Sequence, residues 1–289
     1  MVSLSNHQPN DIRIWDLNII NTGDIGLYPT LFSLGPLKIH TYGALIALGI
    51  SLALFYLSKQ SKKYGFDYQK ILDISIYLVL SGIIGARVFY VIIEYRNFEG
   101  DVTGIFKIWE GGLVFYGGFL TAFATGYYLV RKYKLPVWKT LDLFAPAVPL
   151  AHTFGRMGCF FAGCCYGKPT SLPWAITFKN PDSLAQPVLN IPIHPTQIYE
   201  SLSNLIIFLF LHWLQKHKSF DSQISWTYVI LYSIMRFLVE FLRGDERGFV
   251  FDGLLSTSQL ITLIMIPFAV FMMLIMSKNK KKSKSFAKA

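Results

Sequence analysis

Long apolar runs, each close to the length of a membrane-crossing helix, recur along the chain and alternate with polar or glycine- and proline-rich segments. A helix needs roughly 20 residues to cross the hydrocarbon layer of a bilayer. The pattern predicts seven spans, at residues 40–58, 71–93, 113–130, 141–161, 198–214, 224–242 and 256–276. We therefore expect an all-α integral membrane protein with seven transmembrane helices.

The spans divide the chain into three predicted regions. Residues 1–39 form an N-terminal segment without a basic stretch followed by an apolar core, so no cleavable signal peptide is expected. Residues 40–276 form the membrane domain, and residues 277–289 form a basic tail. The long connection at about 162–197 is rich in proline, which favours a small head outside the membrane over another helix.

Composition and charge support this division and give it an orientation. The chain is 53% hydrophobic and only 15% charged, so it has too few polar residues to cover a soluble domain. Of its 27 Lys and Arg residues, sixteen lie on the side of the first loop and the C-terminal tail, and eight lie on the other side. The positive-inside rule places the richer side in the cytoplasm, so the N-terminus and the head are expected outside.

Excess positive charge also limits the expected partners. The formal net charge is +10, which suits either nucleic acid or anionic lipid. The basic tail is expected to contact anionic lipid headgroups. No motif supports nucleic-acid binding, so we expect none.

Three arginines remain at predicted membrane depth, namely Arg87, Arg156 and Arg236. A charge inside the bilayer costs several kcal/mol, so it normally faces the protein interior and binds something. The alternative is a structural ion pair, for instance between Arg236 and Glu240 one helical turn later.

Most of the polar groups map to one membrane face. Two sets each share a helical face by their spacing: His152 with Arg156 and Cys159, and Arg236 with Glu240 and Arg243. Two arginines around one carboxylate leave net positive charge, and a planar guanidinium binds phosphate oxygens at two points. We therefore predict an anion site for a lipid phosphate at the outer leaflet.

The three cysteines all lie between residues 159 and 165, which excludes a disulfide framework. Cys164 and Cys165 are adjacent and there is no C-x-x-C, so a zinc site has weak support. Cysteine often behaves as a small buried hydrophobe, and packing roles are expected here. No Gly-rich phosphate loop, H-E-x-x-H or G-x-S-x-G motif is present.

From about Leu34 to Leu263 the chain resembles the prolipoprotein diacylglyceryl transferases, a family of seven-span bacterial inner-membrane enzymes. The resemblance lies in a series of motifs in the family's order: Gly85-Ala86-Arg87, the glycine-rich 111–118, Gly155-Arg156-Met157-Gly158, His194-Pro195-Thr196-Gln197, and Arg236 with Glu240 and Arg243.

The resemblance implies transfer of the diacylglyceryl group of phosphatidylglycerol to the lipobox cysteine of a prolipoprotein signal peptide. A thioether forms, glycerol phosphate leaves, and no metal or organic cofactor is needed. Two alternatives stay open: a divergent relative that acts on another lipid acceptor, and a membrane protein that binds or transports lipid without bond chemistry.

The resemblance also implies roles for individual residues. The catalytic set is Arg236, Tyr116, Tyr42 and Glu240, and the set expected to bind the phosphatidylglycerol phosphate or line its cavity is Arg156, Arg243, His194 and Glu200. Candidate helpers are Cys159, Cys164 and Arg87. The chain departs from the family pattern at three of these positions, with Tyr116 in place of a histidine, Cys159 in place of an asparagine and Cys164 in place of a glutamate.

Overall fold

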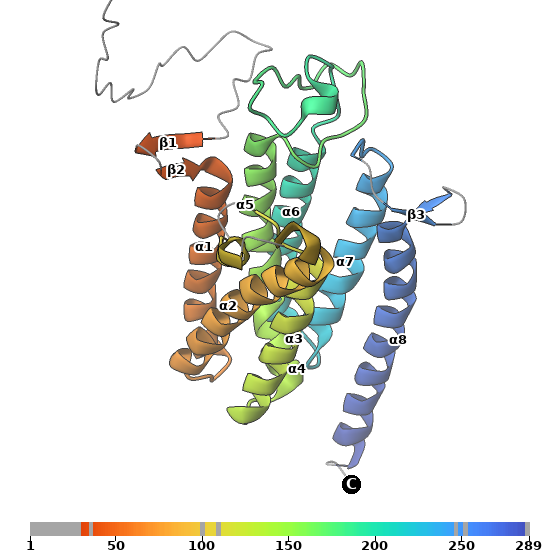
Figure 1. The fold of residues 1–289 in the computed structure, drawn as a ribbon. Helices are drawn as coiled ribbons and strands as arrows, with labels where there is room; N and C mark the ends of the chain where they lie inside the picture. The colour runs from red at the N-terminus through yellow and green to blue at the C-terminus, as the bar shows by residue number, and fades with distance from the viewer. Residues whose placement is uncertain are drawn as a thin grey trace, which may run out of the picture.

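The computed structural model is a bundle of helices (Figure 1) and describes residues 30–34, 37–98, 102–107, 111–245, 248–250 and 254–286. Most of the predicted N-terminal segment lies outside these residues. Each predicted span contains helix: α1 (Thr41–Lys63), α2 (Tyr68–Ile93), α3 (Phe115–Lys132), α4 (Val137–Phe144), α5 (Ala147–Ala162), α6 (Thr196–His217), α7 (Gln223–Glu240) and α8 (Thr257–Phe286).

Three of these helices are long and apolar enough to cross a membrane: α1, α2 and the Thr257–Lys278 part of α8. Large apolar side chains also lie exposed on other helices. On α3, Phe115, Phe119 and Phe123 are exposed and their rings stack along one face. An exposed apolar face of this size suits contact with lipid better than contact with water. The number of spans and their orientation stay predictions.

The fourth predicted span differs from the expected single helix, because it is divided into α4 and α5 at Ala145 and Pro146. Proline lacks a backbone N–H, so Pro146 cannot extend the hydrogen-bond ladder of α4, although Ala145 and Pro146 both keep right-handed helical angles. The short α4 is held by Asp142, whose fully buried carboxylate accepts hydrogen bonds from the backbone N–H groups of Ser222 and Ser225. This contact fixes α4 against the start of α7.

Short strands and 3-10 turns join the helices, and the sequence pattern did not predict them. β1 (Thr30–Leu34) pairs with β2 (Leu37–His40), and β3 (Phe249–Val250) pairs with β4 (Leu255–Ser256), both antiparallel. The 3-10 turns are η1 (Tyr95–Phe98), η2 (Val102–Phe106) and η4 (Gln186–Val188). Such elements are too short to leave a clear hydrophobic period.

The predicted head at about 162–197 includes the ends of two helices, and its residues 163–195 are mostly irregular and lie at the end of the bundle where α5 ends and α6 begins (Figure 1). A small core of Phe160, Phe178, Ala185 and Ile193 holds this segment together. Because it starts and ends at helices that carry candidate residues, its packing fixes the ends of α5 and α6 relative to each other.

Glycine allows α1 and α5 to approach closely. A Cβ added at Gly49 would lie 2.8 Å from the carbonyl oxygen of Ala151, and one at Gly158 would lie 3.0 Å from the Tyr42 ring. Small residues at such crossings let helix backbones come together within a membrane. The start of α1 is thereby held beside the last turns of α5.

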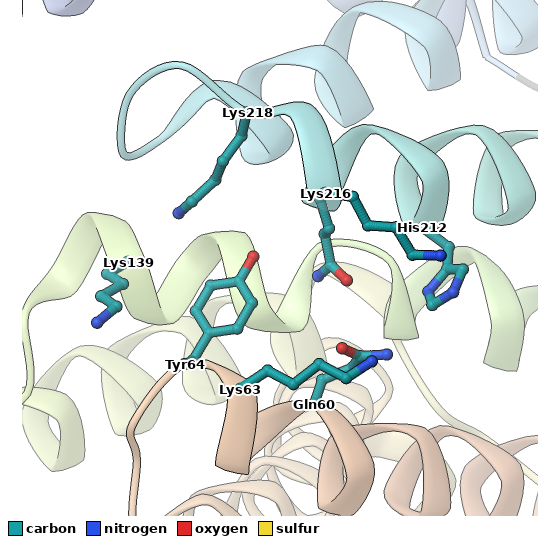
Figure 2. A pocket seen from close by; sticks show the side chains of 8 residues that line it. Gln60, Lys63, Tyr64, Lys139, His212, Lys216 and Lys218 are labelled. Atoms are coloured by element: carbon teal, nitrogen blue, oxygen red, sulfur yellow. The ribbon is translucent and has the colours of Figure 1, made fainter.

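A pocket of about 230 Å³ lies at the opposite end of the bundle, between the C-terminal ends of α1 and α6 (Figure 2). Its lining is strongly basic and consists of Gln60, Lys63, Tyr64, Lys139, His212, Gln215, Lys216 and Lys218. It contains none of the residues for which the sequence predicts catalysis.

Candidate functional site: a buried arginine–carboxylate cluster

Glu200, in the second turn of α6, is the centre of the candidate site. Its carboxylate is 1% exposed, lies 2.5 Å from Nε of Arg156 and 2.7 Å from Nη1 of Arg243, and lies 3.8 Å from Nη1 of Arg236. One side chain thus joins arginines from α5, from α7 and from the turn after α7. The sequence placed Glu200 at the lining of a cavity; the structure makes it the shared partner of three cations.

Two further carboxylates complete the cluster. Glu240 forms an ion pair with Arg236, and Asp245 accepts two hydrogen bonds from Arg243, each 2.8 Å long. Three guanidinium groups therefore meet three carboxylates. The expected excess of positive charge around Glu240 is wrong for the cluster as a whole, because Glu200 and Asp245 balance it. Buried charges of one sign are costly unless partners of the other sign lie against them.

Arg156 and Arg243 differ in how their donors are used. Arg243 is 2% exposed, and its Nε, Nη1 and Nη2 atoms all contact carboxylate oxygens. Arg156 is 14% exposed, and its contacts to Glu200 and to Nε2 of His152 both use Nε. Neither of those contacts uses the terminal nitrogens of Arg156, and Tyr232 on α7 is a further side-chain partner of this arginine.

Arg236 is tied to the start of α8 as well as to the carboxylates. Its Nη2 donates a hydrogen bond to Oγ of Ser258, at 3.1 Å. Sequence reasoning missed Ser258 and also Asp245. Asp245 has a signal in the sequence, because it follows Arg243 by only two residues. Ser258 has none, because it lies 22 positions after Arg236.

Tyr42 lies at the start of α1, against Gly158 of α5. It is half-exposed and interacts electrostatically with Arg156 and with all three cysteines. The structure therefore places Tyr42 beside the cluster, as the sequence predicts for a residue near the lipid headgroup.

Three other predicted site residues do not contact the cluster. Tyr116, on α3, is 57% exposed, and among the described residues it makes a ring contact with Phe115 and no hydrogen bond. His194 lies 3.5 Å from the hydroxyl of Tyr199, to which Trp174 donates a hydrogen bond. These contacts join the irregular segment to Tyr199 in the first turn of α6.

Arg87 is the third of these residues. It is buried in α2 and donates hydrogen bonds to four backbone carbonyls, those of Gly104, Ile105, Gly111 and Gly112. All of these carbonyls belong to the connection between α2 and α3. In this structure Arg87 fixes the connection and the start of α3.

The three cysteines converge, although they were expected to pack as separate small side chains. Cys159 is buried in α5, Cys164 and Cys165 are half-buried in the turn that follows, and none of the three forms a disulfide. Their sulfur atoms lie within 4.8 Å of one another. This group adjoins the arginine cluster, since Cys159 is one turn beyond Arg156 on α5.

Together the fold and the site define a helical membrane protein with a buried arginine–carboxylate cluster at one end of its helices. The chain matches the prolipoprotein diacylglyceryl transferase family over residues 29–275, and it therefore belongs to that family. This confirms the resemblance on which the sequence interpretation rests.

Several curated relatives carry the name phosphatidylglycerol–prolipoprotein diacylglyceryl transferase. The one from Clostridium tetani is 42% identical over 243 residues, which cover 84% of this chain and 95% of the relative. The one from Finegoldia magna is 38% identical over 253 residues, covering 87% and 97%. The one from Thermotoga maritima is 30% identical over 275 residues, covering 92% of each chain.

Proposed function

We propose that this chain transfers the diacylglyceryl group of phosphatidylglycerol to the lipobox cysteine of a prolipoprotein, forming a thioether and releasing glycerol phosphate. This is the first step of lipoprotein maturation. The observation that carries the proposal is the cluster of Arg156, Arg236 and Arg243 around Glu200, in a chain that belongs to this family along most of its length.

The reaction breaks a C–O bond, and the leaving glycerol phosphate gains negative charge as the bond breaks. Cations held in a partly dry site stabilise such charge better than water does, since they need no reorganisation during the step. Arg156 is the first choice for this contact, because its side chain is 14% exposed, compared with 8% for Arg236 and 2% for Arg243. Arg236 lies across Glu200 from it and is the second choice.

The carboxylates then have a positioning role. Glu200 and Glu240 hold Arg156 and Arg236 in fixed places, and Asp245 does the same for Arg243. A guanidinium that is already oriented loses less conformational entropy when the phosphate binds. Because each of the three side-chain nitrogens of Arg243 already contacts a carboxylate, we assign Arg243 to holding Glu200 rather than to direct phosphate contact.

The same proposal includes location and topology. The uneven distribution of lysine and arginine supports a cytoplasmic C-terminus in the bacterial inner membrane, with the arginine cluster and residues 163–195 at the outer leaflet. Anionic lipid headgroups would then meet the basic tail on the cytoplasmic side.

The test is an assay with the purified full-length chain in phosphatidylglycerol vesicles and a synthetic lipobox peptide. We expect release of glycerol phosphate together with a peptide whose mass has increased by one diacylglyceryl group. The control peptide carries serine in place of the lipobox cysteine and should release nothing. Glycerol phosphate release without peptide would indicate a lipid hydrolase, and lipid movement without release would indicate a transporter; either result overturns the proposal.

A further inference from the structure

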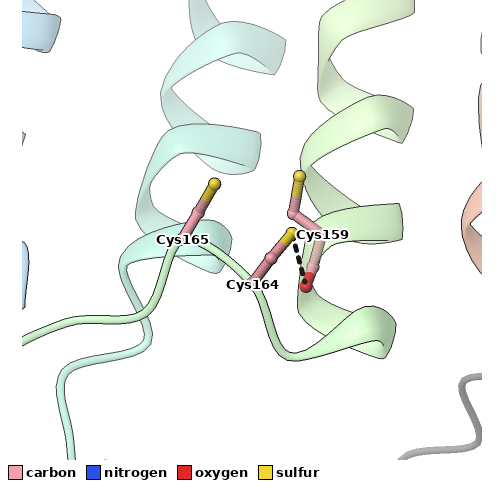
Figure 3. A group of neighbouring side chains, drawn as sticks. All are labelled: Cys159, Cys164 and Cys165. Carbon is pink, nitrogen blue, oxygen red and sulfur yellow. Dashed lines mark hydrogen bonds between the residues drawn. The ribbon is translucent and has the colours of Figure 1, made fainter. Parts of the chain in front are cut away.

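The three cysteine side chains gather between the end of α5 and the start of α6 (Figure 3). Cys159 comes from the last turns of α5, and Sγ of Cys164 lies 3.8 Å from its carbonyl oxygen. No other histidine, cysteine, aspartate or glutamate joins this group within the part of the chain that the structure describes. Three sulfur ligands thus face one small volume.

The turn after α5 has a backbone built to return Cys164 and Cys165 to Cys159. Gly163 ends the helix with a φ of 78°, and a Cβ there would collide with Oγ of Ser183. Cys165 itself has a φ of 61°, a left-handed conformation that costs a residue with a side chain of order 1–3 kcal/mol. Packing alone requires no such turn.

The start of α6 holds this turn in place. Oγ1 of Thr196 donates a hydrogen bond to the carbonyl of Cys165, and Nε2 of Gln197 donates one to the carbonyl of Cys164. Thr196 and Gln197 are both fully buried. The positions of the two adjacent cysteines are therefore fixed from outside the turn, as a preorganised ligand set requires.

The spacing of the sulfur atoms suits a zinc ion. Zinc binds thiolates at about 2.3 Å in tetrahedral geometry, which places the sulfur atoms about 3.8 Å apart. The observed limit of 4.8 Å exceeds that value by about 1 Å. Structural zinc sites use four protein ligands, whereas catalytic sites use three and keep one position open. The cysteine group belongs to the second kind.

The charge around the group suits a thiolate site as well. Arg156 lies one helical turn before Cys159 on α5, so a positive charge adjoins the sulfur atoms. Three thiolates and one divalent ion leave a single negative charge, which the arginines can balance. A purely apolar packing role would not place these thiols beside guanidinium groups.

We propose that Cys159, Cys164 and Cys165 bind Zn²⁺ as thiolates, and that the open fourth position binds the acceptor cysteine of the prolipoprotein. The proposal rests on the proposed function. A thiol that coordinates zinc is deprotonated outright, so the ion would supply the thiolate nucleophile at neutral pH. Tyr116, the residue that sequence comparison places at the position of a base, makes no contact with this region.

The step balances without any oxidant or reductant. The acceptor thiol loses its proton to solvent when it binds the ion. Its sulfur then forms a bond to the glyceryl methylene carbon while the C–O bond to phosphate breaks, and the bonding electron pair leaves with glycerol phosphate. Arg156, one helical turn from Cys159, is placed to receive that phosphate.

The first experiment measures metal binding, independently of activity. Co²⁺ is added to the full-length chain in detergent, after removal of bound metal and reduction of the thiols. We expect one Co²⁺ per chain with thiolate charge-transfer absorption, and its displacement by Zn²⁺. Cys159→Ser and Cys164→Ser should abolish the absorption, while His217→Gln, which removes an exposed metal-binding side chain at the other end of α6, should not. Absorption that persists in both cysteine variants overturns the site, as does wild-type protein that binds no Co²⁺.

The second experiment tests the open position. Addition of the lipobox peptide to the Co²⁺ form should change the visible spectrum, and the serine peptide should leave it unchanged. Metal removal should lower the transfer rate at least about 100-fold, the lower range for loss of an activating proton acceptor, with recovery on adding Zn²⁺. Full transfer by metal-free protein overturns the zinc role but leaves the proposed function standing. A metal-loaded chain that binds the peptide without transferring lipid contradicts the proposed function instead.

Discussion

Within the described residues, arginine is buried at two places, and its partners at the two places differ. In the connection between α2 and α3, Arg87 is surrounded by four neutral backbone carbonyls. In the cluster of α5, α6 and α7, Arg156, Arg236 and Arg243 share one carboxylate. Both arrangements provide partners for a buried positive charge, but they differ in which guanidinium nitrogens the protein itself uses.

Carbonyl oxygens that hold Arg87 belong to the main chain, and the contacts that they make fix local geometry. A carboxylate can instead bind one nitrogen of a guanidinium without using the others. Arg156 shows this, because its contacts to Glu200 and to His152 are both made by Nε. The comparison therefore teaches that depth in the membrane does not identify a ligand-binding arginine. What identifies it is which of its nitrogens the protein already uses.

Replacement of Glu200 by glutamine should have the largest effect. The change leaves three buried guanidinium groups with two carboxylates, and breaking a buried pair typically costs about 3–5 kcal/mol. We expect a large fall in the midpoint of unfolding, measured by thermal denaturation in detergent, together with loss of transfer. The matched control is Asp182→Asn, which removes an exposed carboxylate charge. Equal unfolding midpoints for Glu200→Gln and the wild type would show that the cluster is not held by this charge.

Arg156→Lys comes next and separates charge from geometry. Lysine keeps the positive charge but lacks the planar fork, and loss of one well-placed donor to a transition-state anion costs roughly 10²–10³ in rate. We expect a fall of that size in glycerol phosphate release, with the unfolding midpoint changed much less. Arg96→Lys, at an exposed arginine, is the control and should keep the wild-type rate. Wild-type turnover by Arg156→Lys would reject two-point phosphate binding.

Much of this arrangement could be predicted, because helical spacing is a local property. The apolar runs located the α-helices of the bundle, and the one-turn spacing of Arg236 and Glu240 predicted their ion pair. Arg243 lies in the turn after α7, so helical spacing does not explain its place in the cluster. The division between α4 and α5 has a signal in the sequence, which is Pro146 itself. The apolar run that continues on both sides of this proline predicted a single helix instead.

Contacts between distant segments could not be predicted from spacing. Glu200 meets arginines that lie 36 to 44 positions away in the chain, so its central place depends on how α6 packs against α5 and α7. The meeting of the three sulfur atoms depends on a reversal at Gly163 that two buried residues of α6 hold. No local pattern contains either contact.

Arg87→Lys should lower stability moderately and change the rate little, whereas Arg156→Lys should mainly lower the rate. An ammonium group cannot reach all four carbonyls at once, and a hydrogen bond to a charged group contributes about 1.5–3 kcal/mol. We expect a loss of stability of that order, with a rate per folded molecule closer to the wild type than that of Arg156→Lys. Thermal denaturation and the release assay measure the two effects side by side. A 100-fold loss of rate at unchanged stability would instead place Arg87 against the substrate.

Tyr116→Phe should have the smallest effect, and it tests whether a residue outside both arginine sites takes part in the reaction. The ring of Tyr116 is exposed on α3, its contact among the described residues is with Phe115, and its hydroxyl donates no hydrogen bond there. A general base contributes roughly 10²–10⁴ to a rate, so we expect the phenylalanine variant to lose less than about tenfold. The measurement is the pH profile of glycerol phosphate release, which should keep the wild-type shape. A larger loss with a changed profile would make Tyr116 the acceptor of the thiol proton and would move the chemistry toward α3.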